Sequence, residues 1–211
     1  MNKWIAKIKT LYLKEKLSGV EVASRLNLNR RYVYRIMEKG GIKRRDPAVS
    51  NNIRFLKKSP TFKIKKKLNG DNKSLRDCGV MIYWAEGWKD KRKQMLDFAN
   101  SDPTMIKIYL KFLRNICGVS ENKLRIYLYC YANQDVNKLK KFWSDTAKIP
   151  LKQFTKPYVK KDFREDKINK MPHGLIHIRY ADKKLYSQIF QWYEKIIKKW
   201  AGTEVVKPGT L

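Results

Sequence analysis

The sequence has no apolar run near the roughly 18 residues that would cross a bilayer, and lysines interrupt its N-terminal segment every few residues. It therefore predicts neither a transmembrane segment nor a signal peptide. Cysteine is scarce too: Cys78, Cys117 and Cys130 stand far apart without a CxxC pair, which argues against a zinc site and a disulfide framework. We expect a soluble cytoplasmic protein, associated with the nucleoid if its source is prokaryotic.

Acidic residues are also few. The 211 residues include 19 Asp and Glu against 49 Lys and Arg, which gives a formal charge of +30. Because such a chain repels itself, a polyanionic partner is expected, and nucleic acid is the commonest one. A membrane surface would favour basic residues gathered beside one apolar face, whereas here they are spread among aromatic residues along the whole chain. We expect a nucleic-acid partner, no membrane and no small-molecule substrate, with a merely solvated lysine-rich surface as the alternative.

A disordered polycation is excluded, because hydrophobic residues make up 43% of the chain and aromatic residues 12%. Changes in composition predict four segments: a helical domain over residues 1–46, a basic linker over 47–74, a second domain over 75–200 and a flexible tail over 201–211. Within the linker we expect a short ordered piece over residues 55–68. The linker carries a block of lysines, which are Lys63, Lys65, Lys66 and Lys67.

The first domain has the pattern of three helices. Apolar residues recur at three- and four-residue spacing near the N-terminus, as in an amphipathic helix. Ser18 is placed to cap a second helix, and Asn29 to cap a third that ends at Gly40. Asn27 lies at the turn between them, where a residue that tolerates positive φ is needed.

This pattern resembles the helix-turn-helix motif of DNA-binding proteins. Ala23 stands where the two helices cross, and Leu28, Val33 and Ile36 are the apolar positions that lock the third helix onto the second. Residues suited to a DNA groove or to the DNA backbone then lie on the third helix and just after it: Asn29, Arg30, Arg31, Tyr34, Arg35, Lys43, Arg44 and Arg45. A three-helix bundle with a solvated basic face is the alternative.

The second domain opens with an apolar helix that ends in Glu86 and Gly87. A carboxylate is unfavourable at the C-terminal end of a helix and costly to bury, so we expect a compensating partner, for which a divalent cation is a good candidate. Beyond this helix, alternation and periodicity predict a mixed α+β domain with helices on one side of a four-stranded sheet. The expected strands are 94–100, 123–132, 154–160 and 174–180, and the expected helices are 103–117, 135–147 and 183–200.

The only two histidines, His173 and His177, lie in the segment HGLIHIRY, which is typical of a strand and would place them about 13 Å apart by strand rise. This separation is too large for one metal ion, so structural or phosphate-contacting roles are favoured.

Residues 79–87, GVMIYWAEG, resemble the motif of the LAGLIDADG homing endonucleases, and the resemblance extends over roughly residues 75–198. Met81 stands at the motif's small residue and Trp84 at its first acid. The end of the segment matches the small residue, acid and glycine that close the motif, with Ala85, Glu86 and Gly87.

The resemblance implies a curved antiparallel sheet that grips double-stranded DNA, with Mg²⁺ held by Glu86. In that family two motif helices pack side by side, and this chain has one, so a homodimer on a palindromic site is implied. The first hypothesis is a metal-dependent, site-specific double-strand endonuclease, with Glu86 catalytic and Lys156 stabilising transition-state charge. Lys89 would contact a phosphate. The second hypothesis is a transcriptional regulator that keeps the fold without cutting, which the absence of the first acid favours.

Overall fold

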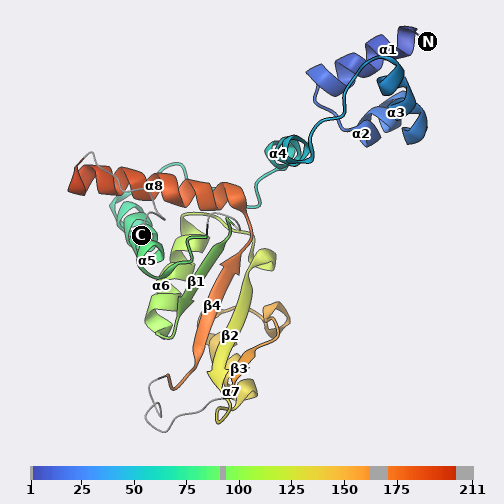
Figure 1. Cartoon of the computed structure of the whole chain (residues 1–211). Helices are drawn as coiled ribbons and strands as arrows, with labels where there is room; N and C mark the ends of the chain where they lie inside the picture. Colours follow the sequence, from blue (N-terminus) through green and yellow to red (C-terminus); the bar gives the residue numbers. More distant parts are fainter. Residues whose placement is uncertain (1, 91–93, 162–170, 203–211) are drawn as a thin grey trace. The chain divides into compact units, whose positions relative to one another are not determined.

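The computed structural model of the chain describes residues 2–90, 94–161 and 171–202 (Figure 1). It divides into two compact units, Met1–Ser59 and Pro60–Leu211, and each has its own hydrophobic core. The described residues form eight α-helices and one four-stranded mixed sheet, so the mixed α+β class is confirmed. No helix in these ranges has the length and apolar character needed to cross a membrane.

The first unit is entirely helical. It consists of α1 (Asn2–Lys9), which continues as a π-helical turn (Thr10–Lys14), α2 (Gly19–Leu26), α3 (Arg30–Lys39) and α4 (Pro47–Lys57). The three helices expected within residues 1–46 are therefore present. Their apolar faces meet in a small core, formed by Ile8, Tyr12, Val22, Ala23, Val33, Ile36, Met37 and Ile42.

The predicted caps of α2 and α3 are confirmed. The Ser18 hydroxyl accepts a hydrogen bond from the Glu21 backbone N–H, and the Glu21 carboxylate accepts one from the Ser18 N–H, which makes a capping box. The Asn29 side chain accepts a hydrogen bond from the N–H of Arg31. Between the helices Asn27 has a φ of 53°, the left-handed conformation that a turn of this kind requires.

The expected basic linker over residues 47–74 differs from the structure, which divides this segment between the two units. Its first part is α4, where Pro47 occupies the first helical turn and Asp46 caps the N-terminus. Proline breaks a helix interior but suits this position, because the N–H that it lacks has no partner there. The N–H groups of Lys63 and Lys65 donate to the carbonyls of Gly118 and Ile116 in the second unit.

The second unit is built around the four-stranded sheet. Its helices and strands, in chain order, are α5 (Gly70–Glu86), β1 (Leu96–Asn100), α6 (Pro103–Asn115), β2 (Arg125–Tyr131), α7 (Val136–Ala147), β3 (Tyr158–Lys160), β4 (Leu175–Tyr180) and α8 (Lys183–Ala201). The apolar helix therefore begins at Gly70 rather than at residue 75, because the Asn69 side chain caps it by accepting from the N–H of Asn72.

The antiparallel sheet implied by the family resemblance is wrong in one strand. The strand order is β1-β4-β2-β3, in which β4 runs antiparallel to both neighbours but β3 runs parallel to β2. The cause is α7, because a helix that connects two neighbouring strands of one sheet returns the chain to the same end and makes them parallel. β3 is also shorter than the expected strand over 154–160, because it begins only at Tyr158.

The two faces of the sheet differ. Alternate residues of β1, β2 and β4 point into the main core, where they meet side chains from α5, α6, α7 and α8. Figure 1 shows α5, α6 and α8 grouped beside the sheet. The expectation of helices on one side is thus met within the described residues. We call the opposite surface the open face, and the residues of it that matter below are Asp97, Tyr127, His177 and Arg179.

Candidate nucleic-acid interface

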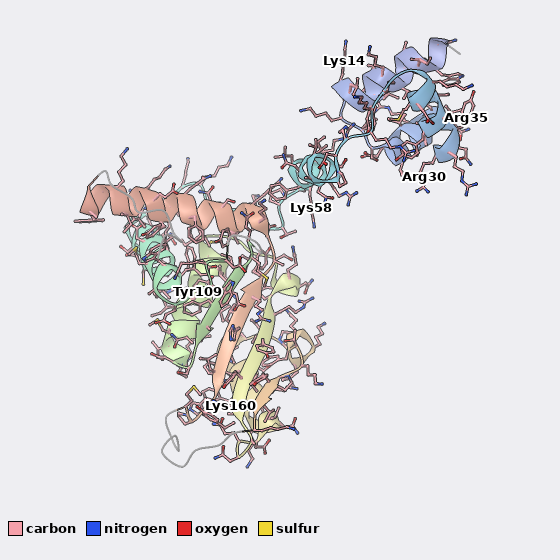
Figure 2. All side chains as sticks on the ribbon, in the orientation of Figure 1. Lys14, Arg30, Arg35, Lys58, Tyr109 and Lys160 are labelled. Atoms are coloured by element: carbon pink, nitrogen blue, oxygen red, sulfur yellow. The ribbon has the colours of Figure 1, made fainter. Side chains whose placement is uncertain are left out.

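The basic residues of α3 lie on its exposed side. Val33, Ile36 and Met37 turn toward the core, whereas the predicted residues Arg30, Arg31 and Arg35 are exposed. Figure 2 shows the side chains of Arg30 and Arg35 extending away from the helices. Tyr32 is exposed too, and the Arg35 guanidinium lies 5.2 Å from the centre of its ring. The exposed side of α3 therefore carries three arginines and a tyrosine ring.

Two residues predicted to contact DNA, Asn29 and Tyr34, have partners within the first unit. The Asn29 side chain is occupied as the cap of α3. The ring of Tyr34 packs on Gly19 so closely that a Cβ there would lie 2.6 Å from its atoms, and the Arg44 guanidinium covers it at 4.3 Å. Tyr34 thus holds α3 against the start of α2.

Arg45 is also engaged within the first unit. Its guanidinium donates to the backbone carbonyls of Tyr12, Lys16 and Leu17, where the first helix ends, and lies 3.9 Å from the centre of the Tyr12 ring. Carbonyls at a helix end lack partners within the helix, so Arg45 acts as a C-terminal cap. Of the predicted residues that follow α3, Lys43 and Arg44 are the exposed ones.

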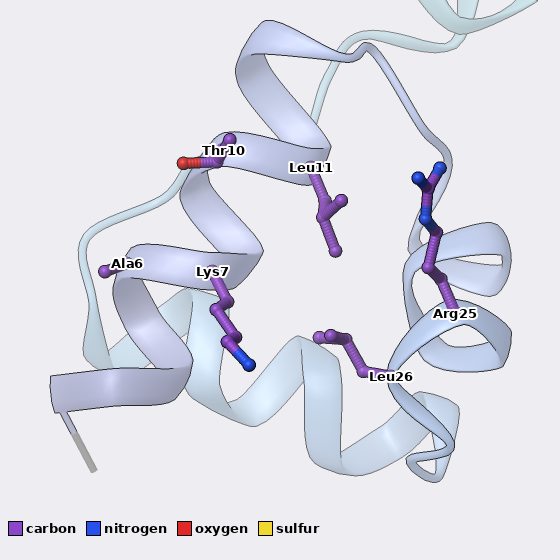
Figure 3. Close-up of a pocket in the computed structure, with 6 residues that line it drawn as sticks. All are labelled: Ala6, Lys7, Thr10, Leu11, Arg25 and Leu26. Carbon is purple, nitrogen blue, oxygen red and sulfur yellow. The ribbon is translucent and has the colours of Figure 1, made fainter.

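A hollow of about 430 Å³ lies between the first helix and α2 (Figure 3). Leu11 and Leu26 face each other across it, and Lys7 and Arg25 stand at its sides. None of the predicted site residues lines this hollow, and its lining has no acid, histidine or cysteine.

Glu86 is the last residue of α5 and its side chain is exposed. The expected burial cost is therefore absent, and the argument for a compensating cation loses that basis. The following Gly87 is required by space, because a Cβ there would lie 2.4 Å from the carbonyl oxygen of Tyr83. Beyond it the N–H of Trp88 donates to the carbonyl of Asp97 at 2.7 Å, which joins the end of α5 to β1.

Lys89 and Lys156 lie in different parts of the second unit. The ammonium of Lys89 donates to the carbonyl of Trp84 at 2.7 Å and so caps α5. Lys156 is exposed beside the β2–β3 edge, where the neighbouring Thr155 donates to Ile126. Because β4 separates β1 from β2, the structure does not bring Lys156 and Glu86 together as one catalytic pair. The predicted Lys63, Lys65 and Lys66 are exposed.

The second half of α5 has an exposed stripe of low polarity, whereas Asp71, Lys73 and Ser74 are exposed in its first half. Cys78, Met81 and Ala85 recur on it at three- and four-residue spacing and are exposed to solvent. Gly79 points the other way, toward the ring of Phe112 in α6, and a Cβ there would lie 2.2 Å from that ring. The glycine therefore serves the packing of α5 on α6, and the small and apolar stripe remains at the surface.

The open face holds a cluster that the sequence predicts only in part: a structural or phosphate-contacting role is expected for His177, but not its pairing with Asp97 and Arg179. The Asp97 carboxylate in β1 bonds Nδ1 of His177 and Nε of Arg179, each at 2.7 Å. The Arg179 guanidinium lies 4.7 Å from the centre of the Tyr127 ring. The alternation of residues 123–132 does predict that Tyr127 faces away from the core, but no local signal pairs β1 with β4.

Burial alone would raise the pKa of the Asp97 carboxyl, whose exposed fraction is 9% for the whole residue. The hydrogen bond and charge of His177, together with those of Arg179, outweigh burial, so the pKa lies below its ordinary value. The carboxylate therefore stays ionised between its two basic partners. The other histidine, His173, lies outside β4 and stacks on the ring of Phe142, with 3.8 Å between the ring centres.

Among the residues that the structure describes, no three side chains of His, Cys, Asp or Glu gather as a metal-binding group. Comparisons of the chain with models of protein families, with characterised proteins and with solved structures find no match.

Proposed function

We propose that the protein binds double-stranded DNA in a sequence-specific manner, with residues 1–46 acting as a helix-turn-helix domain. The observation that carries this proposal is the α2–α3 pair. Its turn has the left-handed Asn27, and its second helix is capped at the N-terminus and exposes Arg30, Arg31 and Arg35 while its apolar side is buried. In proteins of this class the second helix enters the major groove, where arginine bonds guanine with two donors.

The charge of the chain supports the same conclusion. With a formal charge of +30, contacts to phosphates supply a large part of the binding free energy, and each one makes binding more sensitive to salt. We expect the logarithm of the affinity to fall with the logarithm of the salt concentration, at about −0.9 per phosphate contacted.

The test is to select bound duplexes from a random pool and to measure the affinity of the enriched sequence over a range of salt. A consensus sequence with a steep salt dependence is expected. Binding without a consensus would contradict sequence-specific recognition, and a slope near zero would contradict DNA as the partner.

We also propose that the active form is a homodimer joined through α5. The exposed stripe of Cys78, Met81 and Ala85 supports this, because a helix face with little polarity is stabilised when a second copy covers it. A two-fold symmetric dimer would favour a palindromic site. The resemblance of residues 79–87 to the LAGLIDADG motif points to the same face, although the parallel β3 departs from the sheet that the resemblance implies.

Endonuclease activity is the second candidate function, and the exposure of Glu86 beside this stripe favours it. Mg²⁺ is commonly held by one or two carboxylates together with substrate phosphates and water. Among the described residues of one chain Glu86 belongs to no group of three metal ligands, so we propose the site only for a dimer on DNA, where both copies of Glu86 would hold the metal. The metal would supply an activated water and charge stabilisation for the leaving oxygen.

Incubating the selected duplex with the protein and Mg²⁺ separates the two functions. Cleavage of both strands supports the endonuclease, whereas an intact duplex supports a regulator that binds without cutting.

A further inference from the structure

The open face of the sheet holds a cluster that neither the helix-turn-helix proposal nor the Glu86 proposal uses. Asp97 is nine-tenths buried and stands between His177 and Arg179, with which it makes two hydrogen bonds of 2.7 Å. The side chains of the two basic residues are partly exposed, at 24% for His177 and 33% for Arg179. A buried acid thus supports two basic groups that reach solvent.

The hydrogen bonds to Asp97 leave other side-chain nitrogens of His177 and Arg179 available to bind a ligand. Asp97 takes Nδ1 of His177 and Nε of Arg179, which are the nitrogens nearest the backbone. Within the described part of the chain, Nε2 of His177 and the two Nη atoms of Arg179 have no hydrogen-bond partner. These atoms lie at the ends of the two side chains.

Aromatic contacts restrict both side chains further. The Tyr127 ring lies 4.7 Å from the Arg179 guanidinium and meets the His177 ring edge to face, with 5.5 Å between the ring centres. A guanidinium and an imidazole fixed in this way lose little conformational entropy when they bind a ligand. The Nη groups of Arg179 can donate to a ligand with several acceptor oxygens on one centre, and Nε2 of His177 donates to the same ligand when the imidazole is protonated.

We propose that His177 and Arg179, positioned by Asp97, form a binding site for one phosphate group. This inference rests on the proposed function where the phosphate belongs to a DNA backbone, and it is independent of that function where the phosphate is free. A phosphate of the DNA backbone and a free phosphate offer the same acceptor oxygens, and the experiments below distinguish the two.

The first experiment measures the affinity of the full-length protein for the selected duplex by fluorescence anisotropy. His177→Gln and Arg179→Gln are each expected to weaken binding about tenfold, because each removes a charge-assisted hydrogen bond. Arg125→Gln is the matched control. Arg125 is the cross-strand partner of Arg179, but its guanidinium donates to the carbonyls of Asn122 and Leu124. Equal losses in all three variants would overturn the site, because charge alone would then explain them.

Asp97→Asn tests the positioning role. The variant keeps both basic side chains and gains one net positive charge, so a purely electrostatic role predicts equal or tighter binding. Loss of positioning predicts weaker binding, measured well below the melting temperature of the variant. Tighter binding would overturn the role given to Asp97.

The second experiment follows the imidazole signals by NMR. The chain has two histidines, so His173→Gln assigns the His177 signal. The protein is titrated with the duplex and, separately, with inorganic phosphate, both in the wild type and in a variant with Arg30, Arg31 and Arg35 changed to Ala.

A His177 shift with duplex in both proteins supports a backbone phosphate at the site, independent of α3. A shift with inorganic phosphate in a protein that does not bind duplex supports the site and contradicts the proposed function. The absence of a shift with either ligand overturns the site.

Discussion

Asp97 and His177 are 80 positions apart in the chain, yet Oδ1 of Asp97 and Nδ1 of His177 lie 2.7 Å from each other on the open face of the sheet. The antiparallel pairing of β1 with β4 makes this possible, since Asp97 is in register with Arg179 and Ala99 with His177. Side chains of one strand alternate between faces, so Arg179 and His177 share the face on which Asp97 lies.

Replacing Asp97 by Asn should make the stability of the protein less dependent on pH. Because the pKa of this carboxyl is lowered in the folded state, its ionised form stabilises the fold above the ordinary pKa of 3.8, and that contribution is lost as the pH falls through the lowered value. At pH 7 we expect Asp97→Asn to cost about 1–3 kcal/mol of unfolding free energy. Urea denaturation at several pH values measures this, and the difference from wild type should shrink toward pH 3. A difference that stays constant over this range would contradict the prediction.

Replacing Gly79 by Ala should destabilise the second unit by about 1–3 kcal/mol, because the new methyl group would lie against the Phe112 ring in a filled core. Gly70→Ala is the matched control, since that position of α5 has no atom within 4 Å of an added Cβ. Thermal unfolding of both variants should show a loss for the first and little change for the second. Equal melting temperatures would show that α5 and α6 are not packed through Gly79.

Replacing Ser18 by Ala should cost the first unit about 1 kcal/mol, because the N–H of Glu21 would lose the hydroxyl that caps α2. Ser24→Ala, in the exposed part of the same helix, serves as the control. Chemical denaturation monitored by circular dichroism gives both values. An equal effect of the two substitutions would indicate helix propensity rather than capping.

Arg31→Ala should relax the sequence preference more than Lys65→Ala does. Arg31 lies on the exposed side of α3, whereas Lys65 lies on an extended segment whose N–H bonds to Ile116. A base contact discriminates among sequences by about 1–3 kcal/mol, while a phosphate contact weakens binding to all of them. Affinities for the consensus and for single-base variants decide this. If both substitutions weakened binding to all these duplexes by the same factor, Arg31 would contact a phosphate rather than a base.

Glu86→Gln should abolish Mg²⁺-dependent cleavage, if the wild type cleaves, and should leave DNA affinity nearly unchanged. The amide keeps the size of the side chain and removes the charge that would hold the metal. Because Glu86 is exposed, the fold should not change, which thermal unfolding verifies. Cleavage that survives the substitution would exclude Glu86 from the mechanism.

Interactions between residues that are close together in the chain could be predicted from the sequence. The caps at Ser18 and Asn29 and the left-handed Asn27 follow from short-range chemistry, since each involves residues at most a few positions away. The periodicity of the helices and the alternation of Tyr127 away from the core are local properties as well. The helix α4, which begins at Pro47 inside the expected linker, has a local cause as well, because proline suits the first turn of a helix as well as a break.

The sequence by itself determined the charge of the chain, the helices of the first unit and the capped α3 with its exposed arginines. Only the tertiary structure decided that β3 is parallel, that Arg45 caps the first helix, that Glu86 is exposed and that Asp97 lies between His177 and Arg179. The physical reason is distance along the chain. Strand pairing and side-chain contacts between remote segments depend on the packing of the whole core. A short pattern of residues carries no information about that packing.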